Sequence, residues 1–359
     1  MKVVLVSEGP KVINDEVFRV LESQGVSFRR VVISELRDDG GSRLARKLRR
    51  YFPNRKVTKP IADAVASFRP DVVHVASGRP VALAVMKAMK RHPRVPVVFD
   101  HGAIGGLNRF NPFDWKTYFN RRIDKLIVPS KAMLNNWVGR QSLMRLISPA
   151  RVAVLPHPVE VPEGNGWDRA ALRARLGIGA KEFAIGTVCT VRPIKNLPFL
   201  ADVVRRLGPP FVLVVIGPTD DAAERKRLEA AGGDRVRFAG LVPYARDLMP
   251  AFDLYATPTG TPGEAFGLAI AEAMSRSVPV LAMNFGGAAE IVEHEVSGLA
   301  LPADPEHWRQ AIAALANDPD RRWRMGAAGR RRIAERFSPE AIAADCLELY
   351  RRTARLGGV

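Results

Sequence analysis

The stretch LYATPTGTPGEAFGLAIAEAM, residues 254–274, carries the clearest fold signal in the chain. An apolar run ends near Ala256, a loop rich in threonine, proline and glycine follows, and a helix is predicted to begin near Phe266 or Gly267. The free N–H groups at the start of such a helix point back toward the strand ends and suit a phosphate group. Gly267 has no side chain, so the backbone can approach a ligand closely there. The stretch therefore predicts a strand–loop–helix unit with an anion site at its turn.

Two glutamates in this stretch are candidate hydrogen-bond acceptors for a ligand. Glu264 lies in the loop before the predicted helix, and Glu272 lies inside the helix, eight positions later. Eight positions correspond to about 80° beyond two full helical turns. We therefore expect the two carboxylates to share one side of a cleft without touching. The alternative is that Glu264 complements the helix dipole and Glu272 is a solvated surface residue.

Outward from this stretch, short apolar runs alternate with amphipathic stretches along the whole chain. Both faces of each run are apolar, which is typical of parallel strands covered by helices on both sides. The sequence thus predicts an α/β protein with two Rossmann-like doubly wound domains facing a central cleft, where ligands bind at the carboxyl ends of the strands. The predicted strands are Val3–Val6, Arg30–Ile33, Val72–Val75, Val97–Phe99, Lys125–Val128, Val152–Leu155, Ala184–Cys189, Phe211–Ile216, Val236–Phe238, Leu254–Ala256, Val280–Ala282 and Gly298–Leu301.

The boundary between the two domains is predicted from proline and glycine. Residues 156–166 contain three prolines and two glycines, which excludes a helix or an inner strand. We expect an N-terminal domain over residues 1–158, a linker over 159–180 and a second domain over 181–336. A C-terminal helix over 337–359, with Ser338 as its cap and Pro339 in its first turn, is expected to cross back to the first domain.

Composition limits the kind of protein this is. The 359 residues are 47% hydrophobic and 26% charged, as in a globular protein, and Cys189 and Cys346 have no metal-ligand spacing around them. We expect reduced thiols and a cytoplasmic protein, since no signal peptide or membrane-spanning run is evident. The net charge of +18 indicates a phosphate-bearing partner: a nucleic acid, an anionic membrane or a phosphorylated small molecule.

The segment that begins at Glu264 contains motifs that resemble those of a known family. The motifs SVPV at 277–280, GGAAEIV at 286–292 and SGL at 297–299 accompany two glutamates with seven residues between them. This pattern, including the Phe-Gly between the glutamates, resembles the donor domain of family-4 retaining glycosyltransferases of the GT-B fold. The resemblance implies that Glu264 holds hydroxyls of the donor sugar and Glu272 the ribose, with Phe266, Gly267 and Leu268 beside the donor. It also implies that the domain over 181–336 binds the nucleotide sugar and that the domain over 1–158 is the acceptor-side domain.

A second segment, GTVCTVRPIKN at 186–196, is similar to the pyrophosphate-binding loop of that family, where an arginine and a lysine neutralise the leaving diphosphate. Lys195 fits the family register. The arginine departs from it, because Thr190 stands five residues before the lysine, where the family commonly has arginine, and Arg192 stands three before. Either Arg192 reaches the phosphate from a shifted backbone, or Lys195 and the helix after Glu264 hold the diphosphate alone. A basic loop facing solvent is the remaining alternative.

Other candidate contacts follow strand ends. Gly217 is expected to line the nucleotide, and the resemblance implies that the base lies near Leu241 and Val242. In the first domain the resemblance implies that His101, which follows Asp100 at a strand end, contacts the donor sugar. Gly9, in the first turn, is expected to approach the diphosphate or the acceptor. A structural role for the lone histidine is the alternative.

A basic stretch is the candidate membrane contact. Residues 42–62 hold eight basic residues and no acidic one, and Leu44, Leu48, Tyr51 and Phe52 share one face at helical spacing. Residues 43–59 are therefore predicted to meet an anionic membrane surface or a lipid-linked or phosphorylated acceptor. The alternative is a helix that packs this face on its own sheet.

Together these features predict a metal-independent, retaining glycosyltransferase. We expect it to move a hexose-type sugar from a nucleotide diphosphate sugar to a glycan, lipid-linked or other hydroxyl acceptor, in bacterial-type cell-surface polysaccharide or glycolipid synthesis. No cofactor is expected, because Asp318-Pro319-Asp320 is predicted to be a helix start and the histidines have no zinc spacing. A nucleotide-sugar epimerase and a non-catalytic sugar-nucleotide binder remain alternatives. Nucleic acid is not an expected partner, since no nucleic-acid-binding module is evident.

Overall fold

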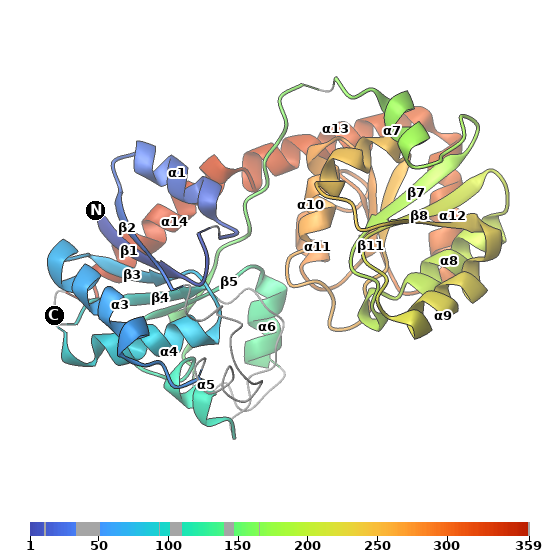
Figure 1. Ribbon diagram of the computed structural model, residues 1–359. Coiled ribbons are helices and arrows are strands. Elements are labelled where there is room, and N and C mark those ends of the chain that lie inside the picture. Colours follow the sequence, from blue (N-terminus) through green and yellow to red (C-terminus); the bar gives the residue numbers. More distant parts are fainter. Residues whose placement is uncertain are drawn as a thin grey trace. The chain divides into compact units, whose positions relative to one another are not determined.

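The computed structural model describes residues 1–10, 12–33, 51–92, 94–100, 110–139, 147–164 and 166–357. The chain forms two compact units (Figure 1). Unit 1 comprises Met1–Pro158 together with Pro339–Val359, and unit 2 comprises Val159–Ser338.

Unit 1 contains a parallel sheet in the order β2-β1-β3-β4-β5-β6. Its strands are β1 (Lys2–Ser7), β2 (Ser27–Val32), β3 (Val72–Val75), β4 (Val97–Asp100), β5 (Lys125–Val128) and β6 (Val152–Val154). Its helices are α1 (Asp15–Ser23), α3 (Arg55–Phe68), α4 (Arg79–Ala88), α5 (Pro112–Lys116), α6 (Lys131–Gly139) and α14 (Pro339–Ala354). As predicted, the C-terminal helix α14 returns to this unit, where it packs beside α1 (Figure 1).

Unit 2 contains a second parallel sheet in the order β12-β11-β10-β7-β8-β9. Its strands are β7 (Phe183–Val188), β8 (Phe211–Ile216), β9 (Val236–Gly240), β10 (Leu254–Thr257), β11 (Val280–Met283) and β12 (Leu299–Leu301). Its helices are α7 (Arg169–Arg175), α8 (Leu197–Leu207), α9 (Ala222–Gly232), α10 (Leu268–Ser275), α11 (Ala288–Ile291), α12 (Pro305–Asn317) and α13 (Pro319–Arg336), with 3-10 turns η5 (Pro193–Lys195) and η7 (Ala245–Ala251).

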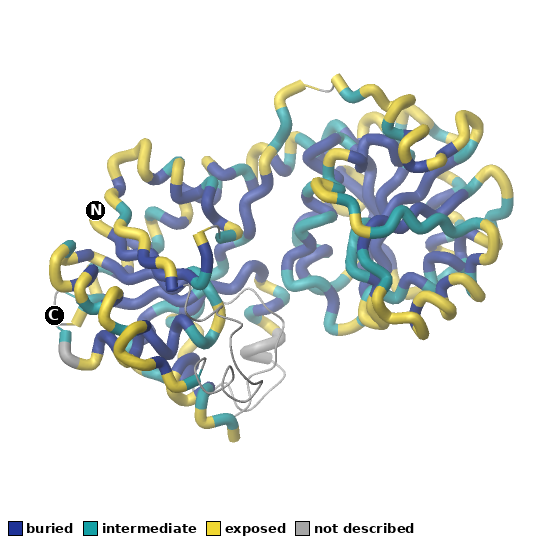
Figure 2. The backbone as a smooth tube through the Cα atoms, viewed as in Figure 1, coloured by how far each residue is buried: buried dark blue, intermediate teal, exposed yellow. Residues whose placement is uncertain are grey.

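The two faces of the unit 2 sheet carry separate apolar layers. Along β8, Val212 and Val214 pack on one layer, and Leu213 and Val215 pack on the other. Figure 2 shows the strands of each unit as buried chain surrounded by helices with exposed outer faces. Because both faces of the sheet are buried, apolar side chains are favoured on both sides of each strand. This explains the unbroken valine-rich runs in the sequence. The predicted α/β architecture with two parallel sheets is confirmed.

The predicted strands are all present, and β2 differs most in its bounds. It begins at Ser27 rather than Arg30, because it is the edge strand of its sheet and most of its residues are exposed. An edge strand with one covered face has no continuous apolar run to mark its start. Helix α7 lies within the stretch predicted as a linker, because Leu176 and Ile178, which follow it, are buried in the core of unit 2.

Candidate active site

The centre of the unit 2 sheet sets the position of the site. Strand β7 pairs with β8 on one side and with β10 on the other, so the chain order reverses between β7 and β10. Connections leave these two carboxyl ends in opposite directions, and this opens a crevice in which open α/β sheets bind ligands. The residues after both strands meet at this crevice.

A pocket of about 340 Å³ lies there. It combines basic, acidic and backbone groups from the loop after β7, the loop after β10 and the start of α10. The pocket is lined by Val188, Cys189, Thr190, Arg192, Ile194, Lys195, Tyr255, Thr257, Glu264, Gly267, Leu268, Ala269 and Ile270.

Lys195 and Glu264 form the central contact of this pocket. Lys195 ends the 3-10 turn η5, and its Nζ donates to Glu264 Oε1 across 2.6 Å. Both side chains are about one-quarter exposed, at 24% and 21%. Thr259 Oγ1 donates to the same oxygen, also at 2.6 Å. The lysine predicted to hold a phosphate and the glutamate predicted to hold a sugar are thus direct neighbours, which their spacing in the sequence did not indicate.

Backbone contacts fix the loop that carries Glu264. The N–H of Gly260 donates to Ile194 O at 2.7 Å, and the N–H of Gly287 donates to Glu264 O at 2.7 Å. Gly287 has no room for a side chain, since a Cβ there would lie 2.6 Å from Phe266 Cα. The GGAAEIV motif therefore supports the Glu264 loop, a role that its sequence pattern alone did not indicate.

The start of α10 supplies backbone donors to the pocket. The helix begins at Leu268, one or two residues later than predicted, and its N-cap Gly267 has a φ of 107° that favours glycine. The N–H groups of the first helical turn have no acceptor within the helix, and Leu268, Ala269 and Ile270 line the pocket. This end of the helix favours an anion.

Arg192 lines this pocket, and so does Thr190, which occupies the position where the family commonly has arginine. The side chain of Arg192 is exposed and forms no ion pair with any residue that the structure describes. Thr190, at the family's arginine position, is half-buried.

Burial raises the pKa of the neighbouring Cys189 thiol to about 11, and Lys195 opposes this shift. The thiol therefore stays protonated near neutral pH and is a poor nucleophile.

Glu272 lies apart from this pocket. Its carboxylate is 4.0 Å from Arg246, which belongs to η7. Burial raises the pKa of Glu272, while Arg246 and Arg276 oppose the shift. The two glutamates do not touch, but the helical angle used to relate them does not apply, because Glu264 precedes the first helical residue by four positions.

The remaining predicted residues of unit 2 lie at three different places. Gly217 follows β8 with a φ of 142°, and a Cβ there would lie 1.9 Å from Cys189 O, so only glycine fits this crossing. Leu241 follows β9 and is 77% exposed, and Val242 is half-buried against the core. Phe266 is buried, with its ring 5.6 Å from that of Phe337. Its side chain is thus a core group, and only its backbone can face a donor.

In unit 1, Gly9 follows β1, and its carbonyl accepts a hydrogen bond from Ser7 Oγ at 2.6 Å. His101 lies outside the described residues, as do residues 43–50 of the predicted membrane contact. Of the rest of that stretch, Tyr51 has its ring 4.3 Å from Phe113, and Phe52 is 57% exposed.

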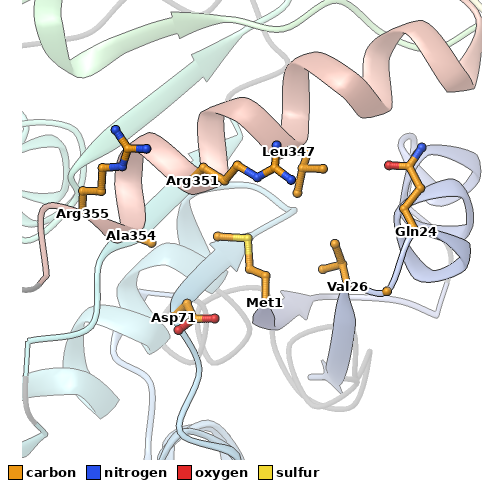
Figure 3. A pocket seen from close by; sticks show the side chains of 9 residues that line it. Met1, Gln24, Val26, Asp71, Leu347, Arg351, Ala354 and Arg355 are labelled. Atoms are coloured by element: carbon orange, nitrogen blue, oxygen red, sulfur yellow. The ribbon is translucent and has the colours of Figure 1, made fainter.

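A separate pocket of about 410 Å³ lies in unit 1 (Figure 3). It is formed by Met1 and Val26 near the amino ends of β1 and β2, by Asp71 just before β3, by Arg351 of α14 and by Arg355 just after that helix. Asp71 already accepts a hydrogen bond from the N–H of Lys2 at 2.7 Å. Since ligands of open α/β sheets bind at the carboxyl ends of the strands, this pocket is the weaker candidate.

Asp318-Pro319-Asp320 is a helix start, as predicted: α13 begins at Pro319, and Asp318 accepts from the N–H of Arg321 at 2.8 Å. Within the described ranges, no group of three or more histidine, cysteine, aspartate or glutamate residues is arranged to hold a metal ion. The described helices include none with the length and apolar character needed to cross a membrane.

Two family descriptions match the chain. "Glycosyltransferase Family 4" matches residues 12–162, and "Glycosyl transferases group 1" matches residues 168–332, which include the whole pocket. A D-inositol 3-phosphate glycosyltransferase of Segniliparus rotundus is 32% identical over 253 residues, 66% of this chain and 55% of that protein. A GDP-mannose-dependent alpha-(1-6)-phosphatidylinositol monomannoside mannosyltransferase of Mycobacterium tuberculosis is 32% identical over 200 residues, 51% of each chain. The matches thus span about half the length of these relatives.

Solved structures share the fold. A glycosyltransferase of Rickettsia africae superposes with a TM-score of 0.75 at 18% identity and 98% coverage of both chains. The Anabaena protein Alr3699/HepE, solved with UDP-glucose, gives a TM-score of 0.72 at 19% identity, covering 98% of this chain and all of that one.

Proposed function

The chain belongs to the family of group 1 glycosyl transferases, and from this premise we propose that it is a retaining, metal-independent enzyme that uses a nucleotide diphosphate sugar. The donor would bind in the pocket between the loops after β7 and β10. The proposal rests above all on one observation: Lys195, Glu264 and the first turn of α10 line the same pocket at the switch point of the sheet.

Each group in the pocket suits one part of such a donor. Lys195 and the N–H groups at the start of α10 are donors for diphosphate oxygens, and Arg192 is an exposed cation at the rim. The carboxylate of Glu264 is an acceptor for sugar hydroxyls. We assign Glu272 to the ribose hydroxyls and the backbone near Leu241 and Val242 to the base.

The proposed reaction breaks the bond between the sugar's anomeric carbon and the diphosphate oxygen. The departing diphosphate keeps the electron pair, and Lys195 and the α10 dipole stabilise its growing negative charge. The acceptor hydroxyl attacks from the same face, and an oxygen of the leaving phosphate accepts its proton. Retention of configuration then needs no protein nucleophile, which agrees with the protonated thiol of Cys189.

The acceptor is proposed to be a phosphorylated or lipid-linked polyol or glycan. The two relatives act on an inositol phosphate and a phosphatidylinositol mannoside according to their names, and the +18 charge of this chain favours an anionic acceptor. An assay with D-inositol 3-phosphate as acceptor, and with UDP-glucose and GDP-mannose as donors, tests this choice. The proposed setting is cytoplasmic synthesis of cell-surface polysaccharide or glycolipid.

The variant Glu264→Gln tests the role of the pocket. It keeps the size of the side chain but removes the charge, and we expect turnover to fall by about 100-fold or more. Affinity for UDP or GDP should stay the same or increase, because Lys195 loses a competing carboxylate. Turnover is measured as release of the nucleoside diphosphate in EDTA, since no metal is required, and affinity is measured by calorimetry.

The exposed Glu163, changed to glutamine, is the matched control and should leave both quantities unchanged. Near-normal turnover in Glu264→Gln would contradict the assignment. Conversion of the donor without any acceptor would instead favour an epimerase. Binding of the donor with no turnover under any condition would favour the non-catalytic binder that the threonine at position 190 suggests.

A further inference from the structure

A chain of two threonine hydroxyls leads from the sheet to the carboxylate of Glu264. Thr257 Oγ1 and Thr259 Oγ1 are 3.1 Å apart, and Thr259 Oγ1 is 2.6 Å from Glu264 Oε1. We infer that Thr259, oriented by Thr257, is a positioning residue that holds Glu264 in place for the donor sugar. The inference rests on the proposed function, in which Glu264 binds sugar hydroxyls.

The direction of the hydrogen bonds follows from the chemistry of the groups. An ionised carboxylate only accepts hydrogen bonds, so Thr259 must donate its single hydroxyl hydrogen to Glu264. Thr259 then has no hydrogen left for Thr257, and Thr257 must be the donor of the other bond. The chain therefore runs one way, from Thr257 through Thr259 to Glu264 Oε1.

Burial makes this chain a firm support. Thr257 is 7% exposed and Thr259 is 4% exposed, so water competes little for their hydroxyls. Thr257 ends β10 and is in register with Ala282 of β11, which anchors the first hydroxyl to the sheet. A buried hydroxyl that lost its hydrogen-bond partner would not regain it from water, so the arrangement resists rearrangement.

The two oxygens of Glu264 are used differently. Oε1 accepts from both Lys195 and Thr259, whereas Oε2 has no hydrogen-bond partner among the described residues. Oε2 is thus the oxygen left to accept from a sugar hydroxyl. In the proposed reaction a diphosphate attracts Lys195, and Thr259 then remains the one described donor that keeps the carboxylate oriented.

The test compares two substitutions of Thr259. Thr259→Val keeps the shape and removes the hydroxyl, and we expect kcat to fall by about 10- to 100-fold, as displaced catalytic groups commonly cause. The affinity for UDP or GDP should change by less than about 3-fold. The affinity for UDP-glucose or GDP-mannose should fall relative to that for UDP or GDP, because the contribution of the sugar decreases. Thr259→Ser keeps the donor and should recover most of the lost turnover.

A double-mutant cycle separates positioning from a general structural role. If Thr259 acts through Glu264, Thr259→Val should cause little further loss in the Glu264→Gln background. Equal losses in both backgrounds, or normal kcat in Thr259→Val, would overturn the inference while leaving the proposed function intact. Wild-type protein that transfers no sugar from either donor would instead overturn the proposed function. If Thr259→Val does not fold, Thr257→Val takes its place, with an expected loss of about 3- to 10-fold and the same cycle.

Discussion

Lys195 and Glu264 each limit what the other can do. With the two side chains paired at 2.6 Å, the site has a neutral centre, and an incoming diphosphate must compete with a carboxylate for the lysine. Arg192, in contrast, lies exposed at the rim without an ion pair among the described residues. Exposed charges are screened by water and salt, so the two cations should contribute unequally to binding.

Substitution of the two cations measures this difference. We expect Lys195→Met to weaken UDP or GDP binding by about 10- to 100-fold, the usual worth of a charged hydrogen bond in a sheltered site. Arg192→Gln should weaken it by less than about 10-fold. Calorimetry at low and high salt provides the measurement. A larger loss for Arg192→Gln would show that the arginine has taken over the main phosphate contact from the family position occupied by Thr190.

At the residue level, the sequence indicated Lys195, Glu264 and Gly267 but not the threonines that support them. Glutamates, lysines and glycines carry rare chemistry or rare backbone angles, so each is informative in a short motif. A threonine in a loop has many ordinary uses. The hydroxyl of Thr259 is brought within 2.6 Å of a carboxylate five residues later only by the fold of the loop.

Among the elements, the turn at Gly286 and Gly287 is the one that most directly supports the site. It follows β11, and its backbone lies against the loop of Glu264, whose carbonyl accepts the N–H of Gly287. Gly286 also has a φ of 70°, which favours glycine. A side chain at either position would displace the loop after β10.

Gly287→Ala should therefore reduce both stability and activity. The added Cβ would meet the backbone of Phe266 at 2.6 Å, and backbone cannot rotate away as a side chain can. We expect a destabilisation of about 1–3 kcal/mol and a clear loss of turnover. Gly260→Ala, in the loop after β10, is the control, because the nearest atom to its Cβ is 3.5 Å away. The stability of both variants is measured by thermal unfolding, and their turnover by the sugar-transfer assay.

The sequence predicted strands better than the ends of elements. Valine-rich runs mark inner parallel strands, whereas the polar edge strand β2 began three residues before its predicted start. The angle between Glu264 and Glu272 was calculated for a continuous helix, but Glu264 lies in the loop before α10. The geometry of that loop depends on packing partners such as Gly287 that lie further along the chain.

In the molecule as a whole, an apolar face and a buried hydrogen bond between side chains hold α14 to unit 1. Ile342, Ala343 and Cys346 pack with residues of β1 and α1. His74 Nδ1 on β3 and Tyr350 OH on α14 form a hydrogen bond at 2.5 Å, with both residues fully buried. Burial lowers the pKa of His74 to about 3.

Because the pKa of His74 is lowered by folding, we expect the protein to lose stability in acid. The unfolded chain takes up the proton below about pH 6.5, whereas the folded chain resists it down to about pH 3, so folding is favoured fully above pH 6.5 and less as the pH falls. The expected contribution of His74 is a loss of about 2 kcal/mol between pH 6.5 and pH 5. His74→Asn should flatten this part of the dependence, measured by denaturant unfolding at both pH values. An unchanged acid slope in His74→Asn would refute the prediction.

The return of α14 has a consequence for the order in which the protein is made. Unit 2 is one continuous segment, and the N–H of Val159 at its entry donates to Phe337 O at its exit across 2.8 Å. The ribosome therefore delivers a complete second unit while the first still lacks the helix that covers β1 and β3. The lobe that is translated first is finished last, and until then its uncovered apolar strands are a surface for chaperones to shield.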